Sequence, residues 1–186
     1  MYRCLLATFS IVALLAPGAY AQDFARSGPY LGIAGSIVIP TDLESGIDLA
    51  SGGLQARAGY RFHPNLAAEL RYEWIQDFTP SFFSAREDIS PWTLMADGRV
   101  HLLTGRFQPL LIAGMGIMHA KREGQTILGR RTSSESTSFA ARFGAGIDIY
   151  ATDRIAFGFD ISYVLPTGSL EDLDYLSFGL GVQYRF

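Results

Sequence analysis

The sequence predicts an all-β fold, an eight-stranded antiparallel up-and-down transmembrane β-barrel, and three observations point to it. Apolar and polar side chains alternate in eight separate segments, and a period of two is typical of strands. Most of these segments have about ten residues, the length that a tilted strand needs to cross a bilayer. The links between the segments are alternately short and long. Strands of this length, joined in this way, are typical of a closed membrane barrel.

The composition fits one domain and excludes several kinds of partner and site. The chain has 186 residues and a net charge of −3, and its positive residues are scattered, so no nucleic-acid partner is expected. Its 20 glycines and 13% aromatic residues favour many short strands over helices. The single cysteine, Cys4, lies near the N-terminus, which leaves the rest of the chain without a disulfide or a thiolate metal site. We therefore expect no cofactor and no metal.

Residues 1–21 have the features of a cleaved signal peptide. Arg3 supplies the positive charge, residues 5–15 form an apolar stretch, and Ala19 and Ala21 form a small-x-small cleavage site. An anchor helix is the alternative, but the stretch is shorter than the roughly 20 apolar residues that span a bilayer. We expect residues 22–186 to form the outer-membrane β-barrel domain.

The first four strands are predicted from their alternation. The clearest is 54–62, where Leu54, Ala56 and Tyr60 share one face and Arg57 and Arg61 share the other. Segments 67–74 and 92–102 repeat this pattern, whereas 30–39 follows it less cleanly. Because successive side chains of a strand point to opposite faces, the apolar sets are expected to face lipid and the charged sets the barrel interior.

The second half of the chain supplies four more strands. Segments 139–150, 157–163 and 176–186 alternate clearly, whereas 109–119 is apolar on both faces. Short turns are expected at 63–65, 103–106 and 151–154, and longer links at 40–51, 75–91, 121–136 and 166–173. An even number of strands, with short turns on one side, predicts a barrel whose two termini are both periplasmic.

A soluble β-sandwich or a lipocalin-like barrel also alternates, with apolar side chains inside. The strand lengths exceed the roughly 5–6 residues usual in soluble sheets. The charged faces also carry Gly, Ala and Ser, which suits a confined interior. Aromatic residues gather near strand ends, where membrane interfaces are expected. The membrane barrel is therefore the favoured interpretation.

The last strand carries the most specific pattern, because Val182, Tyr184 and the terminal Phe186 alternate to the chain end. With the signal peptide and eight strands, this strand resembles the outer-membrane protein A type (OmpA-like) β-barrel superfamily. The resemblance implies a bacterial outer-membrane location and a terminal strand recognised by the barrel-assembly machinery. Because the chain stops at Phe186, the peptidoglycan-binding domain of larger members is not expected.

The inward faces are predicted to hold an ionic network. An eight-stranded barrel leaves an interior that side chains just fill, so the charges should pair with one another. Such a network is either a solid plug or a gate that rearranges to pass ions. Its expected members are Arg57, Arg61, Glu69, Arg71, Glu73, Asp97, Arg99, Arg142, Asp148, Asp160 and Arg185.

Catalysis is not expected, although some barrels of this size modify lipid A. Of His63, His101 and His119, only His119 lies near the outer rim, and no serine is within two residues of it. The most favoured function is structural or surface-interacting, with a small gated pore or a hydrophobic-ligand conduit as the alternative. Outer-membrane lipids are expected partners. Around the third long link, four basic residues could meet lipopolysaccharide phosphates: Lys121, Arg122, Arg130 and Arg131.

Overall fold

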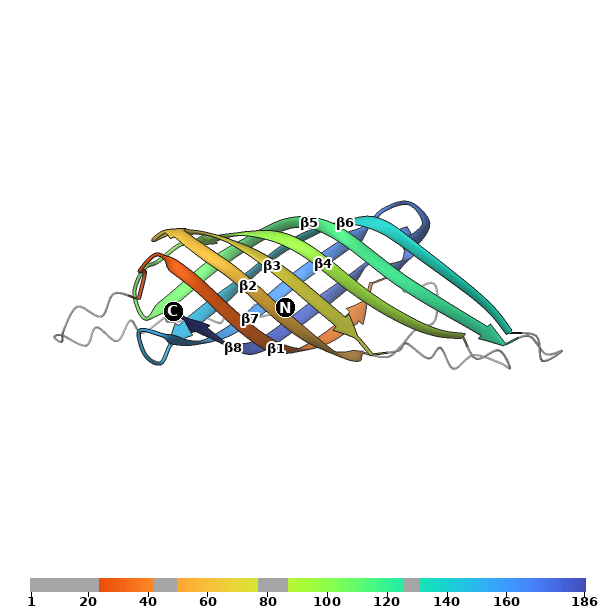
Figure 1. Cartoon of the computed structure of the whole chain (residues 1–186), viewed down its shortest axis with the longest axis horizontal. Helices are drawn as coiled ribbons and strands as arrows, with labels where there is room; N and C mark the ends of the chain where they lie inside the picture. Colours follow the sequence, from red (N-terminus) through yellow and green to blue (C-terminus); the bar gives the residue numbers. More distant parts are fainter. Residues whose placement is uncertain (1–23, 42–49, 77–86, 126–130) are drawn as a thin grey trace, which may run out of the picture.

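The computed structural model describes residues 24–41, 50–76, 87–125 and 131–186. Within these residues, eight strands form one closed barrel in which each strand is antiparallel to its neighbours and β8 pairs with β1 (Figure 1). The strands are β1 (Gly28–Pro40), β2 (Ser51–His63), β3 (Leu66–Ile75), β4 (Glu87–His101), β5 (Phe107–Gln125), β6 (Arg131–Tyr150), β7 (Ile155–Pro166) and β8 (Tyr175–Arg185). The predicted fold class is confirmed.

The third long link differs from the prediction. Strand β5 continues to Gln125 and β6 already begins at Arg131, so most of the expected link 121–136 is a paired hairpin. Strand β4 also begins earlier than expected, at Glu87. These three strands project beyond the others at one end of the barrel (Figure 1). The extension lacks an apolar face, so its sequence resembles a loop although its backbone is paired as a sheet.

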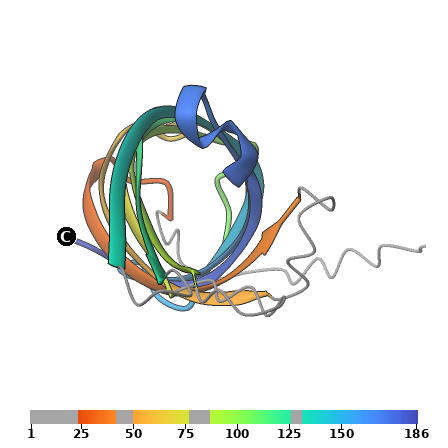
Figure 2. The same ribbon diagram turned by 90° about the vertical axis from the view of Figure 1, so that its right-hand side faces the viewer.

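The two ends of the barrel are named here by their connections. The terminal mouth carries the short turns together with Phe24 and Phe186, and the loop mouth carries the long links. The link between β7 and β8 contains a short 3₁₀ helix, η2 (Gly168–Leu173). Seen from the loop mouth, η2 lies at the rim of the barrel (Figure 2). No helix among the described residues is long and apolar enough to cross a bilayer.

The outer wall is apolar and has aromatic residues toward both ends. At the loop mouth, Trp92 contacts Tyr72 at 6.0 Å between ring centroids and stacks on His119 at 5.3 Å. At the terminal mouth, Tyr184 and Phe186 meet edge to face at 5.1 Å. Because aromatic girdles mark the membrane interfaces of such barrels, the lipid-facing band lies between these two sets.

Candidate functional site in the barrel lumen

The barrel interior holds the charged side chains of the inward faces. The alternation of each strand turns these residues away from the lipid-facing wall, and each is at most 5% exposed. The inward-facing charged residues include all of those expected from the sequence: Arg57, Arg61, Glu69, Arg71, Glu73, Asp97, Arg99, Arg142, Asp148, Asp160 and Arg185.

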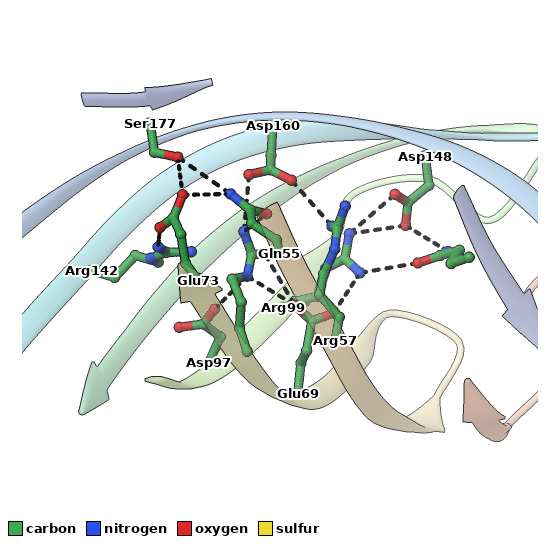
Figure 3. Close-up of polar contacts among 12 residues, drawn as sticks. Gln55, Arg57, Glu69, Glu73, Asp97, Arg99, Arg142, Asp148, Asp160 and Ser177 are labelled. Atoms are coloured by element: carbon green, nitrogen blue, oxygen red, sulfur yellow. Dashed lines mark hydrogen bonds and ion pairs between the residues drawn. The ribbon is translucent and has the colours of Figure 1, made fainter. Parts of the chain in front are cut away.

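Two arginines organise most of the interior charge. Arg71 lies within 3.0 Å of both Glu69 and Asp160, and within 3.1 Å of Asp97. Arg99 joins Glu69 at 3.0 Å to Asp148 at 3.1 Å, so Glu69 is shared between the two arginines. The pairs form a continuous chain along the lumen, and Arg57 joins it at 3.1 Å from Asp160 (Figure 3). His101 lies 3.4 Å from Asp148 and extends the chain.

A second centre is built around Glu73. Arg142 donates to its carboxylate at 2.6 Å, Ser177 at 2.7 Å, Gln55 at 2.9 Å and Tyr175 at 3.2 Å. The Oε1 atom of Gln55 also accepts a hydrogen bond from Arg71 at 3.4 Å, so the Gln55 amide joins the two centres. We call these paired charges together with Gln55 the ionic layer.

Several neutral members of this network were not predicted. Tyr30 donates to Glu69 at 3.0 Å, and Gln183 donates to Asp148 at 3.2 Å. The inner face at Gly59 leaves space for Tyr30, because a Cβ there would lie 2.3 Å from the tyrosine ring. Their place in the alternation was the signal that could have identified them. The inward positions of the strands are occupied by Tyr30, Gln55, Ser177 and Gln183.

The lumen toward the loop mouth is apolar, which the sequence did not predict. Nine buried residues form one cluster there, and Leu170 of η2 enters it from the rim. In these parts of the strands both the inward and the outward residues are apolar. The sequence therefore does not alternate between polar and apolar residues, and it does not show which residues face inward. We call this cluster the apolar layer: Val38, Ile75, Met95, Met118, Ala120, Ala140, Val164, Leu170 and Tyr175.

Arg61 and Arg185 have a different role from the other interior arginines. At the terminal mouth they donate to backbone carbonyls, Arg61 to Pro64 and Arg185 to Asp153 at 2.7 Å. Both also donate to the carbonyl of Phe24, at 3.4 and 2.7 Å respectively. Many of their partners are main-chain carbonyls, which no sequence pattern identifies.

The ionic layer still contains buried polar atoms without a hydrogen-bond partner in the described structure. They include Nε and Nη1 of Arg142 and both carboxylate oxygens of Asp97, although Asp97 is ion-paired with Arg71. Asp97 and Arg142 lie on one register row, separated by Gly114. A Cβ at Gly114 would lie 2.0 Å from Asp97 Oδ1, so this glycine makes room for the carboxylate.

The three histidines lie apart. His63 ends β2, and the lumen-facing His101 lies beside Asp148. His119 faces outward at the loop mouth, where its Nδ1 lies 2.8 Å from Thr137 Oγ1 across the strand pair. Among the described residues, no three His, Cys, Asp or Glu side chains are grouped to hold a metal ion.

The remaining predicted residues are at the chain ends and the third link. Val182, Tyr184 and Phe186 face lipid on β8 and at its end, with exposed fractions of 37%, 39% and 58%. Strand β5 contains Lys121 and Arg122, and β6 begins at Arg131. The predicted cleavage site at Ala19 and Ala21, and Arg130 in the link, lie outside the described residues.

A closed eight-stranded barrel with a lipid-facing wall and a filled lumen defines a small outer-membrane β-barrel protein. The chain belongs to the outer membrane protein beta-barrel domain family, which matches residues 5–186. A comparison with curated protein sequences gives no match.

Solved outer-membrane barrels have the same fold. Neisserial surface protein A (NspA) superposes with a TM-score of 0.70 at 16% identity, covering 86% of this chain and 98% of that chain. The Yersinia pestis attachment invasion locus protein Ail, solved with the heparin analogue sucrose octasulfate, gives 0.59 at 21%, covering 86% and 97%. The N-terminal barrel of Pseudomonas aeruginosa OprF gives 0.56 at 16%, covering 87% and 100%.

Proposed function

We propose that this protein is a structural or surface-interaction protein of the outer membrane, with a closed lumen and no catalytic site. The observation that carries the proposal is the filling of the barrel by two layers in series. The paired side chains of the ionic layer are nearly inaccessible, at most 3% exposed in each ion pair. The apolar layer lies between the ionic layer and the loop mouth, and its one hydroxyl, that of Tyr175, is already donated to Glu73, so its remaining side chains offer little to hold water.

The ionic layer suits a plug because each charge already has partners. Arg71 is held by three carboxylates, and Glu73 accepts four hydrogen bonds. Separating a buried pair leaves two desolvated charges, which is strongly unfavourable. Conduction would require several pairs to separate together.

The loop mouth is the proposed binding end. Strands β4, β5 and β6 continue there as a projecting sheet, which offers a surface well beyond the membrane band. The basic residues of this hairpin, which include Lys121, Arg122 and Arg131, would contact lipopolysaccharide phosphates of the outer leaflet. Binding of sucrose octasulfate by Ail makes an anionic surface ligand a reasonable first probe.

The proposed biogenesis follows from the sequence. Signal peptidase would cut after Ala21, the barrel-assembly machinery would recognise Val182, Tyr184 and Phe186, and both termini would then be periplasmic. Intact-mass analysis of the membrane-embedded protein should give a chain that begins at Gln22, and retention of Met1 would reject the cleavage. An epitope after Phe186 should be unreactive in intact cells and reactive after permeabilisation.

Planar-bilayer recording tests the closed lumen, and it should show no stable conductance for the refolded protein.

Surface binding is tested with cells that express the protein, compared with cells that express a chain whose Arg122 and Arg131 are both changed to Ala. Binding of sulfated oligosaccharide or lipopolysaccharide that is equal in both would count against this end of the barrel. Unchanged lipid A mass in these cells is expected, and an altered mass would indicate an enzyme.

A gated pore is the second candidate, and Arg142 supplies the reason. Its Nε and Nη1 lack hydrogen bonds in the described lumen, and Asp97 lies on the same register row beyond Gly114. Arg142 could therefore exchange Glu73 for Asp97 and open a path. A conductance that disappears in Arg142→Ala and changes in Glu73→Gln would favour this gate over the plug.

A further inference from the structure

The backbone that precedes β1 lies inside the terminal mouth of the barrel. Three side-chain donors converge on the carbonyl oxygen of Phe24: Arg185 Nη1 at 2.7 Å, Gln108 Nε2 at 3.1 Å and Arg61 Nη1 at 3.4 Å. The following residue, Ala25, is only 7% exposed although it precedes the first strand. Outside any strand, the chain is therefore buried at Ala25, and the preceding carbonyl group is satisfied.

Further contacts hold the same segment. The ring of Phe24 lies 5.6 Å from the ring of Tyr150, and the guanidinium of Arg185 lies 5.0 Å from the centre of that ring. Arg185 also donates to the carbonyl of Arg26 at 3.2 Å, and Arg26 donates to the backbone oxygen of Phe186 at 2.9 Å. The segment is thus tied to β2, β5, β6, β8 and the end of the chain.

The three donors are also held by partners outside the segment. Gln108 Oε1 accepts from Arg61 at 2.8 Å, which turns Nε2 toward Phe24 and the carbonyl of Gly105. Arg61 is also held by the carbonyl of Pro64, and Arg185 by that of Asp153. Two guanidiniums and an amide NH₂ present only donors, so this arrangement recognises hydrogen-bond acceptors, and peptide carbonyls fit it.

We propose that Arg61, Gln108 and Arg185 form a binding site for peptide carbonyl groups, which docks residues 24–26 of the same chain as an internal stopper of the terminal mouth. The site lies at the opposite end from the proposed surface-binding hairpin. Its docking does not depend on which side of the membrane this mouth faces. An experiment that disproves the docking of residues 24–26 would therefore leave the proposed function untouched. An experiment that disproves the proposed function would likewise leave the docking untouched.

Thiol labelling tests the docking. Since Cys4 is the single cysteine, a Cys4→Ser background leaves only an introduced thiol. Ala25→Cys places that thiol at a buried position, and Ser27→Cys places it two residues later at an exposed position. A water-soluble maleimide should modify the thiol of Ala25→Cys about tenfold more slowly than that of Ser27→Cys in the folded barrel.

Loss of a donor should release the segment. Arg185→Ala is expected to raise the labelling rate of Ala25→Cys about tenfold, because charge-assisted hydrogen bonds to two carbonyls are lost. The matched control is Arg154→Ala, which removes an exposed arginine of the same mouth that contacts Tyr184 instead, and should leave the rate unchanged. Gln108→Ala provides a second release variant if Arg185→Ala does not give the heat-modifiable gel migration of a folded barrel.

Two results would overturn the proposal. One is labelling of Ala25→Cys as fast as Ser27→Cys in the otherwise unchanged barrel, which needs no arginine variant. The other is a folded Arg185→Ala or Gln108→Ala barrel in which the labelling rate of Ala25→Cys stays as slow as in the parent.

Discussion

The ionic layer and the apolar layer fill the same barrel interior, and they exclude water by different means. In the ionic layer each group is held by named partners in fixed directions, as Glu73 is by Arg142, Gln55, Ser177 and Tyr175. In the apolar layer the van der Waals contacts have no preferred direction. Neighbouring side chains can therefore move to fill part of the cavity that a smaller side chain would leave. We therefore expect single changes to be severe in the first layer and graded in the second.

The largest expected effect is that of Glu73→Ala. The change leaves Arg142 as a buried cation without its 2.6 Å partner, and removal of one member of a buried pair costs about 3–5 kcal/mol. Urea unfolding in lipid vesicles measures it. Glu171→Ala removes an exposed carboxylate of η2 and should change stability by less than about 0.5 kcal/mol. Equal unfolding midpoints for the two variants would show that Arg142 does not depend on Glu73 as its partner.

The same comparison explains how much could be predicted from the sequence. The eight strands and the inward charges were predictable because period two is a property of the strand backbone. The apolar layer was not, since Met95 and Met118 are inward residues in apolar surroundings that give no contrast. The roles of Gln55 and Arg61 depend on contacts that only the folded barrel creates. Gln55 joins side chains of other strands, and Arg61 binds the carbonyl of Phe24.

Charge on the lipid-facing wall should have the next largest effect. Ala145 faces outward, and an arginine near the bilayer midplane costs about 2–4 kcal/mol, so Ala145→Arg should lower the folding yield in vesicles. Ala145→Leu at the same position should fold normally. Gly158→Ala puts a methyl group in the lumen 3.1 Å from Asp148 Oδ1, a tight contact, and should lower the yield less than Ala145→Arg because it adds no charge to the lipid-facing wall. A yield for Ala145→Arg equal to those of the other two would contradict the assigned faces.

A change in the apolar layer should be milder. Leu170 enters this layer from η2, and Leu170→Ala should cost about 2 kcal/mol, the low end for a buried leucine, because the link can follow the smaller side chain. The control is Leu103→Ala, an exposed leucine in a short turn. The comparison of the two layers would fail if Leu170→Ala destabilised the barrel as much as Glu73→Ala in the same urea series.

Deletion of Phe186 should have the smallest effect on stability and a large effect in cells. The side chain lies on the lipid-facing wall, 58% exposed, against Tyr184, so its loss removes an apolar contact worth about 1.5 kcal/mol and leaves a barrel that refolds in detergent. If the terminal strand is the assembly signal that we propose, outer-membrane levels of the deleted chain should fall far more than its stability does. Phe186→Tyr, which keeps the terminal ring, should restore those levels. Normal surface levels of the deletion, measured beside its refolding yield, would show that the terminal residue is not part of an assembly signal in this protein.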